Sequence, residues 1–525
     1  MKNMVKNKLI NKWLLSVIII VLLIIAFGVY EYIRISPRWD NANSFFPELQ
    51  QKAPKVLVFV PHPDDELWLS GLILPELVES GVEAHVVYST EGISTMQGER
   101  NKEAVKSCGH LGIPKKNVHF MGFENFKQFD LDSPSGTRSL EIRNAYKDSI
   151  ESLISRINPQ LIICTDFDFN RDHRTLSILF DEKIGEMLHE HKLNPSTIVW
   201  KGYCYNTSYY SIDDFYNFNL KSTIKPQDVQ NENYEMDTPQ FLWNERIRIP
   251  VSPSVMTRLT LGNPIYQATK EHVTQHVQKK TLLAVNSDQV YWLRRLDNEL
   301  YNSIIYVSSG EEKYLCDFKL LHTDNVTYEK RYDVEYNNCT WIPDSNDCLK
   351  QIDIKLKSPK NISYINIYDN PSLTDDICKM DIIVNDTAVF HVTNVMKKGD
   401  ATRIEINDMI VSSITIKLVE TTGEFAGINE IEVFSTSLPS LYPRIIKICD
   451  GRDSDYNFVY KMFIDDTTKE LPLSFYQYPD SQEYIMSVEG KGARMGDNMV
   501  RFDEDFKKCS VYVSIQNTSV SKLTS

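Results

Sequence analysis

One imidazole and three carboxylates follow directly after a short apolar run near the start of the chain. The run is Val56–Val60, and the six residues PHPDDE at 61–66 come next. His62 and Asp65 are three residues apart across a turn stiffened by Pro63, so both side chains can converge on one point. Imidazole and carboxylate ligands suit zinc, and a catalytic zinc usually has three protein ligands and one position open to water. The segment therefore predicts two ligands of a zinc site.

A third ligand is expected at the end of another strand. A second apolar run, at 161–164, is followed by acidic residues and then by His173, which we expect to complete the site. Ligands in open α/β sheets sit outside the carboxyl ends of the strands, where both segments would meet. A simpler interpretation stays open: Asp64 and Asp65 could only cap the helix that follows, since acids stabilise the first turn of a helix.

Three motifs, in this order along the chain, resemble the PIG-L/LmbE-like family of zinc-dependent N-acetylglucosaminyl deacetylases. They are PHPDDE at 61–66, RNKEA at 100–104 leading to Leu-Gly at 111–112, and NRDH at 170–173. The stretch 272–287, expected to be helical, is a weaker fourth element. The resemblance covers about residues 52–305.

The resemblance implies a role for each matching residue. His62, Asp65 and His173 would bind Zn²⁺, Asp64 would be the general base, and Arg100 would contact the substrate. A zinc-bound water has a pKa of about 7, and a neighbouring carboxylate can take its proton as the water attacks an amide carbonyl.

Two residues of the last motif need separate comment. Many family members carry a histidine where this chain has Asn170, which could bind substrate through a hydrogen bond but cannot donate a proton to a leaving amine. Acid catalysis is therefore open, and Asp64 would have to do both jobs. Asp172 is expected to hold a metal ligand in place without touching the metal.

Strands and helices alternate between residues 55 and 206, which predicts a Rossmann-like, doubly wound parallel sheet. Strands are expected at 56–60, 84–90, 118–122, 160–165 and 197–204, and helices at 65–80, 98–111, 139–157 and 173–191. No Gly-x-Gly-x-x-Gly follows the first strand, so we expect no nucleotide cofactor.

The N-terminus predicts a membrane anchor. A basic, cytoplasmic segment at 1–12 precedes an apolar stretch at 13–33, and residues 34–51 are a linker. The apolar stretch is long enough for a single transmembrane helix, which would place the rest of the chain outside the cell. A cleaved signal peptide, with Ala26 to Gly28 as the cleavage region, is the alternative.

Beyond residue 310 the pattern changes to period-two alternation, which predicts antiparallel β-sandwiches. Residues 318–436 resemble a galactose-binding-like (discoidin-type) domain, and residues 441–525 are expected to form a small second sandwich. Either could bind glycans or serve a structural role. The aromatic-rich segment 207–265 could close over the zinc site or be an ordinary packed insertion.

The composition of the chain limits the kinds of partner that it could bind. The formal charge of −14 and the pI near 5.4 argue against nucleic acid. Nine cysteines would permit disulfides in an exported chain, with Cys339 and Cys348 the closest pair. The resemblance to the PIG-L/LmbE-like family, together with the predicted export, implies a zinc deacetylase acting on an N-acetylated extracellular or cell-surface glycan. A zinc amidase for another acyl amide and an inactive surface glycan-binding protein are the alternatives.

Overall fold

The structure is a computed structural model. It describes residues 2–35, 49–90, 97–123, 137–166, 170–202, 204, 246–250, 255, 262–277, 288–320, 340–370, 372, 374–396, 401–435, 445–450, 458–463, 470–472, 484–496, 499–503 and 508–515. The predicted aromatic segment 207–265 therefore lies largely outside the described residues, and so does Cys339. Within the part of the chain that the structure describes, the cysteines at positions 108, 164, 316, 348 and 378 form no disulfide.

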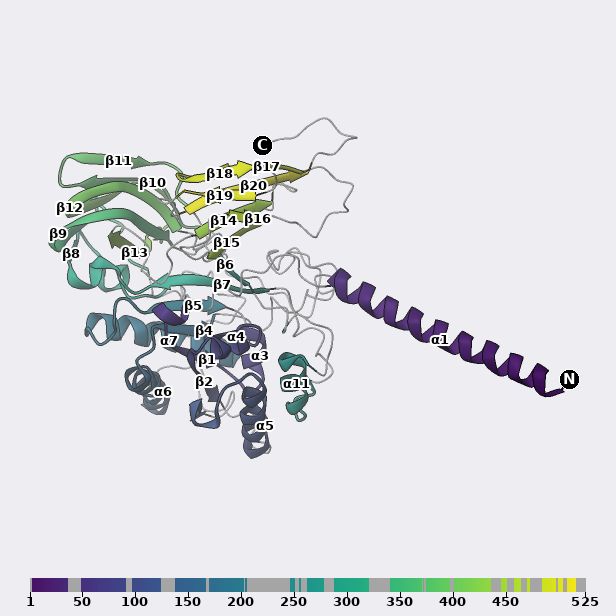
Figure 1. Ribbon diagram of the computed structural model, residues 1–525. Coiled ribbons are helices and arrows are strands. Elements are labelled where there is room, and N and C mark those ends of the chain that lie inside the picture. Colours follow the sequence, from purple (N-terminus) through teal and green to yellow (C-terminus); the bar gives the residue numbers. More distant parts are fainter. Residues whose placement is uncertain are drawn as a thin grey trace.

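A parallel sheet forms the centre of the N-terminal domain (Figure 1). Its strands are β1 (Lys55–Val60), β2 (Glu83–Thr90), β3 (Val118–Phe123), β4 (Leu161–Thr165) and β5 (Ile198–Gly202). They lie in the order β5-β4-β1-β2-β3, and β1 pairs in parallel with both β2 and β4. The predicted parallel α/β sheet is confirmed. Two antiparallel strands, β7 (Asp288–Arg295) and β6 (Arg246–Pro250), continue the sheet beyond β5.

Helices cover both faces of this sheet. They are α3 (Asp65–Leu69), α4 (Leu74–Glu79), α5 (Gln97–His110), α6 (Thr137–Ile157), α7 (Arg171–His189) and α11 (Pro264–Glu271). Along β1, Leu57 and Phe59 pack into one core with α6 and α7, whereas Val56, Val58 and Val60 pack into the other core with α3, α4 and α5. The uninterrupted apolar run of β1 thus reflects burial on both faces.

Two predicted helices differ from the structure. The expected helix 65–80 is divided into α3 and α4, and Gly71 lies at the break, where a Cβ would come within 2.5 Å of the Leu67 carbonyl oxygen. The expected helix at 272–287 is not formed over residues 272–277, which make turns after α11 has ended at Glu271. The remainder of that stretch lies outside the described residues.

Helix α1 (Lys2–Ile35) covers the apolar stretch predicted to be a transmembrane anchor. Across the described part of the chain, no helix combines the length and the apolar character needed to cross a membrane. This finding does not support the predicted transmembrane helix at 13–33.

The antiparallel β domain follows the α/β domain. Its strands are β8 (Ile304–Val307), β9 (Gln351–Asp369), β10 (Asp376–Val384), β11 (Ala388–Val392), β12 (Ala401–Thr422) and β13 (Ile428–Ser435). The long strands β9 and β12 pair with each other through two shifts of register. The first half of β9 pairs with β8 and its second half with β13, so the long strands pass from one layer to the other and enclose a core of branched aliphatic side chains. The predicted β-sandwich is confirmed.

The C-terminal strands are arranged differently from the expected separate sandwich at 441–525. They are β14 (Ile445–Asp450), β15 (Phe458–Phe463), β16 (Glu470–Pro472), β17 (Tyr484–Glu489), β18 (Ala493–Gly496), β19 (Met499–Phe502) and β20 (Lys508–Ile515). Strands β14, β15, β17 and β20 extend the large sheet through one pair between β15 and β6, Lys461 with Ile247, whereas β16, β18 and β19 form a small sheet of their own. The domain boundaries remain predictions.

Candidate metal centre

The two segments that carry the predicted ligands meet at one edge of the parallel sheet. β1 ends at Val60, directly before PHPDDE, and its neighbour β4 ends at Thr165, shortly before α7. His62 and Asp65 come from the first connection, and His173 lies in the first turn of α7. Since parallel strands end at the same edge, the fold brings together residues separated by more than one hundred positions.

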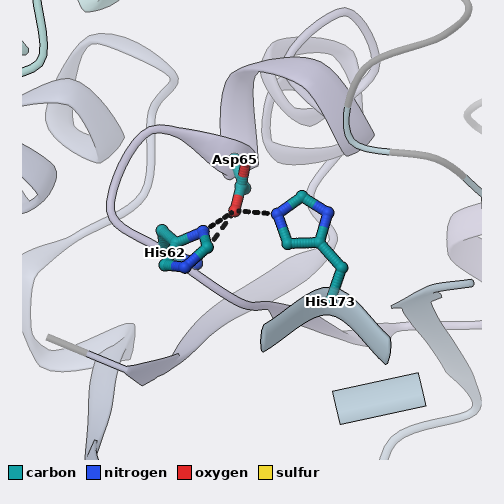
Figure 2. Close-up of side chains that lie close together, drawn as sticks. All are labelled: His62, Asp65 and His173. Atoms are coloured by element: carbon teal, nitrogen blue, oxygen red, sulfur yellow. Dashed lines mark hydrogen bonds and ion pairs between the residues drawn. The ribbon is translucent and has the colours of Figure 1, made fainter. Parts of the chain in front are cut away.

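His62, Asp65 and His173 form a compact, buried group (Figure 2). Asp65 Oδ2 lies 3.0 Å from His62 Nδ1 and 3.3 Å from His173 Nε2, and one possible ligand atom from each residue lies within 4.8 Å of the other two. Two imidazoles and one carboxylate are a donor set that fits zinc and leaves a fourth position open. The three residues predicted as ligands are thus together in a group that could hold a metal ion.

The surroundings of the group favour a charged Asp65 and a fixed His62. Burial raises the pKa of Asp65, but the imidazoles of His173 and His62 outweigh it and hold that pKa well below its usual range. His62 Nε2 lies 2.8 Å from Asp172 Oδ2. A carboxylate on the second ring nitrogen of a metal-binding histidine fixes the orientation of the ring. Asp172 therefore occupies the supporting position expected of it.

Asp64 lies beside the metal group in an unusual backbone conformation. Its φ is 127°, and its side chain is 22% exposed. Burial, followed by the charge of Asp65, raises the pKa of Asp64 to about 7. The Arg100 Nη2 atom lies 3.6 Å from Asp64 Oδ1 and donates a hydrogen bond to the Pro63 carbonyl oxygen at 3.0 Å. The structure thus brings the predicted base and the predicted substrate contact together next to the metal group.

Asn170 has a structural role that the sequence analysis did not anticipate. It is the N-cap of α7, and its side-chain oxygen accepts a hydrogen bond from the Asp172 backbone N–H at 3.0 Å. The first turn of that helix contains His173. Capping therefore contributes to the position of a candidate ligand, independently of any contact with substrate.

We expect Asn170→Ala to lower the free energy of unfolding by about 1 kcal/mol, the usual cost of losing an N-cap side chain. Asn170→Asp keeps an acceptor oxygen at the same place and should retain most of this stability. Urea denaturation of the two variants beside the wild type measures the difference. Equal destabilisation by alanine and aspartate would contradict the capping role.

A second buried cluster, which the sequence analysis missed, contacts the backbone of Asp64. Glu66 Oε2 accepts the Asp64 backbone N–H at 3.0 Å, and Glu66 Oε1 accepts the Ser107 hydroxyl at 2.7 Å and lies 2.6 Å from His272 Nε2. Burial opposes charge on Glu66 and His272, but their mutual attraction outweighs it, so the pKa of Glu66 is lowered and that of His272 is raised. Glu66 belongs to the first motif, whereas nothing in the spacing pointed to His272 as its partner.

Loss of the His272 side chain should be costly, because it would leave the buried Glu66 carboxylate without its cation. We expect His272→Leu to destabilise the fold by about 3–5 kcal/mol. The surface pair His110–Glu271, separated by 3.1 Å, provides a matched control. His110→Leu should cost less than about 1 kcal/mol. Thermal denaturation that ranks the two variants as equals would contradict an ion pair at Glu66.

Fold and site together define an α/β protein with a candidate metal centre at the carboxyl edge of its parallel sheet. Residues 57–182 match the PIG-L family, described as GlcNAc-PI de-N-acetylase. This match confirms the resemblance to the PIG-L/LmbE-like family that the three motifs carry. Residues 329–434 match a domain of unknown function, DUF7402. No curated protein matches the chain.

Solved structures are similar to the two domains separately. An N,N'-diacetylchitobiose deacetylase from Pyrococcus horikoshii is 17% identical, with a TM-score of 0.29, and the match covers 47% of this chain and 86% of that one. A deacetylase triple mutant from the teicoplanin biosynthetic pathway is 14% identical, with a TM-score of 0.29 and coverage of 46% and 98%. A family 32 carbohydrate-binding module of C. perfringens NanJ is 16% identical, with a TM-score of 0.20 and coverage of 26% and 95%.

Proposed function

We propose that this protein is a zinc-dependent N-deacetylase that hydrolyses the N-acetyl amide of N-acetylglucosamine-type sugars in a glycan. The observation that carries the proposal is the buried group of His62, Asp65 and His173 beside Asp64, inside a segment that matches the PIG-L family. Zn²⁺ is proposed from the donor set, because two imidazoles and one carboxylate suit this ion.

The residues of the site have complementary roles in amide hydrolysis. A bound zinc ion supplies Lewis acidity, which lowers the pKa of water and polarises a carbonyl. The Asp64 carboxylate takes a proton from the attacking water, and the bond between the carbonyl carbon and the sugar nitrogen then breaks. Asp64 returns the proton to the leaving amine, because Asn170 has none to give. Acetate and a free amino sugar are the products.

Arg100 and Asp172 act by orientation. The Arg100 guanidinium, 12% exposed, lies next to Asp64 and presents donors that could hold the hydroxyl or carbonyl oxygens of a sugar. Asp172 holds the ring of His62 through Nε2 and leaves Nδ1 on the side of Asp65. Each group contributes to the alignment of amide, water and base on which such reactions depend.

The test is acetate release from N-acetylglucosamine, its oligomers and acetylated cell-wall fragments. The full chain would be stripped with a chelator, reloaded with one equivalent of Zn²⁺ and compared with the stripped protein. We expect acetate only from the reloaded sample. Cleavage of another acyl amide without acetate would make the protein a different zinc amidase, and binding without cleavage would make it a glycan-binding protein.

The extracellular location is also a proposal, and it rests on the sequence of residues 1–33 alone. It predicts that a protease added to intact cells degrades the PIG-L domain. Full protection of that domain in intact cells, with degradation after lysis, would place it inside.

A further inference from the structure

Strand β13 of the β-sandwich is tied to the α/β domain by the side chain of Asn298. Asn298 Nδ2 donates to the Ile431 carbonyl oxygen at 2.9 Å, and its Oδ1 accepts the Val433 backbone N–H at 2.9 Å. Asn298 is 4% exposed and lies three residues beyond the end of β7. One amide thus satisfies a main-chain donor and a main-chain acceptor of β13, as a further paired strand would.

The last two residues of β7 extend this junction with buried cations. The Arg294 guanidinium lies 4.1 Å from the ring centre of Phe318, and its Nη2 lies 3.6 Å from Glu432 Oε1 of β13. Arg295 Nη1 donates to the Tyr364 hydroxyl of β9 at 2.8 Å, and its guanidinium lies 4.1 Å from the Phe434 ring centre. Buried cations with such partners fix geometry, because leaving them unpaired is costly.

A helical glycine shows how closely the junction is packed. Gly185 lies within α7, where glycine is disfavoured relative to alanine. A Cβ at this position would lie 2.2 Å from the carbonyl oxygen of Asp317, which lies in the connection between β8 and β9 of the β-sandwich. The Asp317 backbone N–H in turn donates to Glu430 Oε2 of β13 at 3.0 Å. Only glycine allows α7 and this segment to approach so closely.

The other part of β7 holds the helix that begins at the metal ligand Asp65. Tyr291 donates its hydroxyl hydrogen to the Leu69 carbonyl oxygen at 2.7 Å, and Gln289 Nε2 donates to the Trp68 carbonyl oxygen at 3.1 Å. Both acceptors belong to α3, and both donor side chains are buried. Strand β7 therefore contacts α3 through residues near the start of the strand, and it contacts the β-sandwich through residues at the end of the strand.

From these contacts we infer that the β-sandwich is a structural part of the metal centre, rather than a separately moving module. It fixes residues 294–298, at and just beyond the end of β7, and β7 fixes α3 through Tyr291 and Gln289. These five residues act through α3 and are therefore positioning residues. The inference concerns folding and does not require the proposed deacetylase activity, although one of its tests uses metal binding.

The main test compares two glycine substitutions in the full chain. Gly185→Ala places a methyl group against the Asp317 carbonyl, whereas Gly109→Ala in α5 is a matched control, since a Cβ there has nothing within 4 Å. Hydrogen exchange is followed in the peptides covering 65–74 and 428–435. We expect Gly185→Ala to speed exchange about tenfold or more in both peptides, and Gly109→Ala to speed neither, because local opening follows loss of packing.

Faster exchange in 428–435 with unchanged exchange in 65–74 would overturn the inference, because the sandwich would then open without affecting α3. Asn298→Ala, which removes the bridging amide without adding bulk, decides the question by the same comparison if Gly185→Ala does not fold. Exchange needs no metal, so this result is independent of the proposed function.

A second test concerns the contact between β7 and α3. Tyr291→Phe removes only the hydroxyl that binds Leu69, and should weaken zinc binding about tenfold, as loss of an outer hydrogen-bond partner does. Competition with a chromophoric chelator measures the dissociation constant. Unchanged affinity together with unchanged exchange in 65–74 would show that β7 does not position α3. If the wild type binds no zinc, the exchange data alone decide, and only the proposed function fails.

Discussion

Replacement of Asp64 by asparagine is expected to lower kcat for acetate release by about 10²–10⁴-fold, the usual contribution of a general base. Burial and the charge of Asp65 raise the pKa of Asp64 to about 7, so its carboxylate can both accept and return a proton near neutral pH. Asparagine has a similar size but cannot accept a proton. The measurement is steady-state acetate release by the zinc-loaded variant.

Metal content provides the control for Asp64→Asn. The ligand group of His62, Asp65 and His173 does not include Asp64, so zinc stoichiometry should match that of the wild type. The backbone φ of Asp64 is 127°, and asparagine, like aspartate, is among the residues enriched at positive φ. A variant that keeps its zinc and its full rate would remove Asp64 from the mechanism.

Replacement of His173 by alanine is expected to abolish stoichiometric zinc binding. It removes one of the three proposed ligands from a buried site, and the loss of affinity should exceed the roughly 10–100-fold that loss of an outer partner costs. Mass spectrometry of the purified protein measures zinc per chain, and competition with a chelator measures affinity.

Replacement of a histidine outside the site serves as the control, because it also removes an imidazole but leaves the candidate metal centre intact. His391 in β11 has a side chain that is 73% exposed and pairs with Asp381. His391→Ala should leave one zinc per chain. If the His173→Ala protein retains zinc with unchanged affinity, the metal lies elsewhere and the proposed function loses the observation that carries it.

Local features of the sequence were sufficient to predict much of the α/β domain. The apolar run of β1 and the three-residue spacing of His62 and Asp65 are short-range patterns. The run reflects burial of the strand on both faces, and the spacing lets both side chains converge on one point, so each can be read without knowing the tertiary structure. The alternation of strands and helices predicted a parallel sheet, and that topology alone placed His173 at the same edge as the first motif. The break at Gly71 was missed because periodicity does not reveal the close approach of the Leu67 carbonyl oxygen, which leaves no room for a Cβ at that position.

The sequence by itself thus determined the class of the α/β domain and the three residues that meet in its candidate metal centre, since these follow from local pattern and topology. Only the tertiary structure decided what supports them. Glu66 meets His272 across 206 positions, and Asn298 meets Ile431 across 133. The junction between the domains likewise depends on Arg294 and Glu432 approaching within 3.6 Å. Such pairs have no spacing rule, because burial and charge complementarity select them only after the chain has folded.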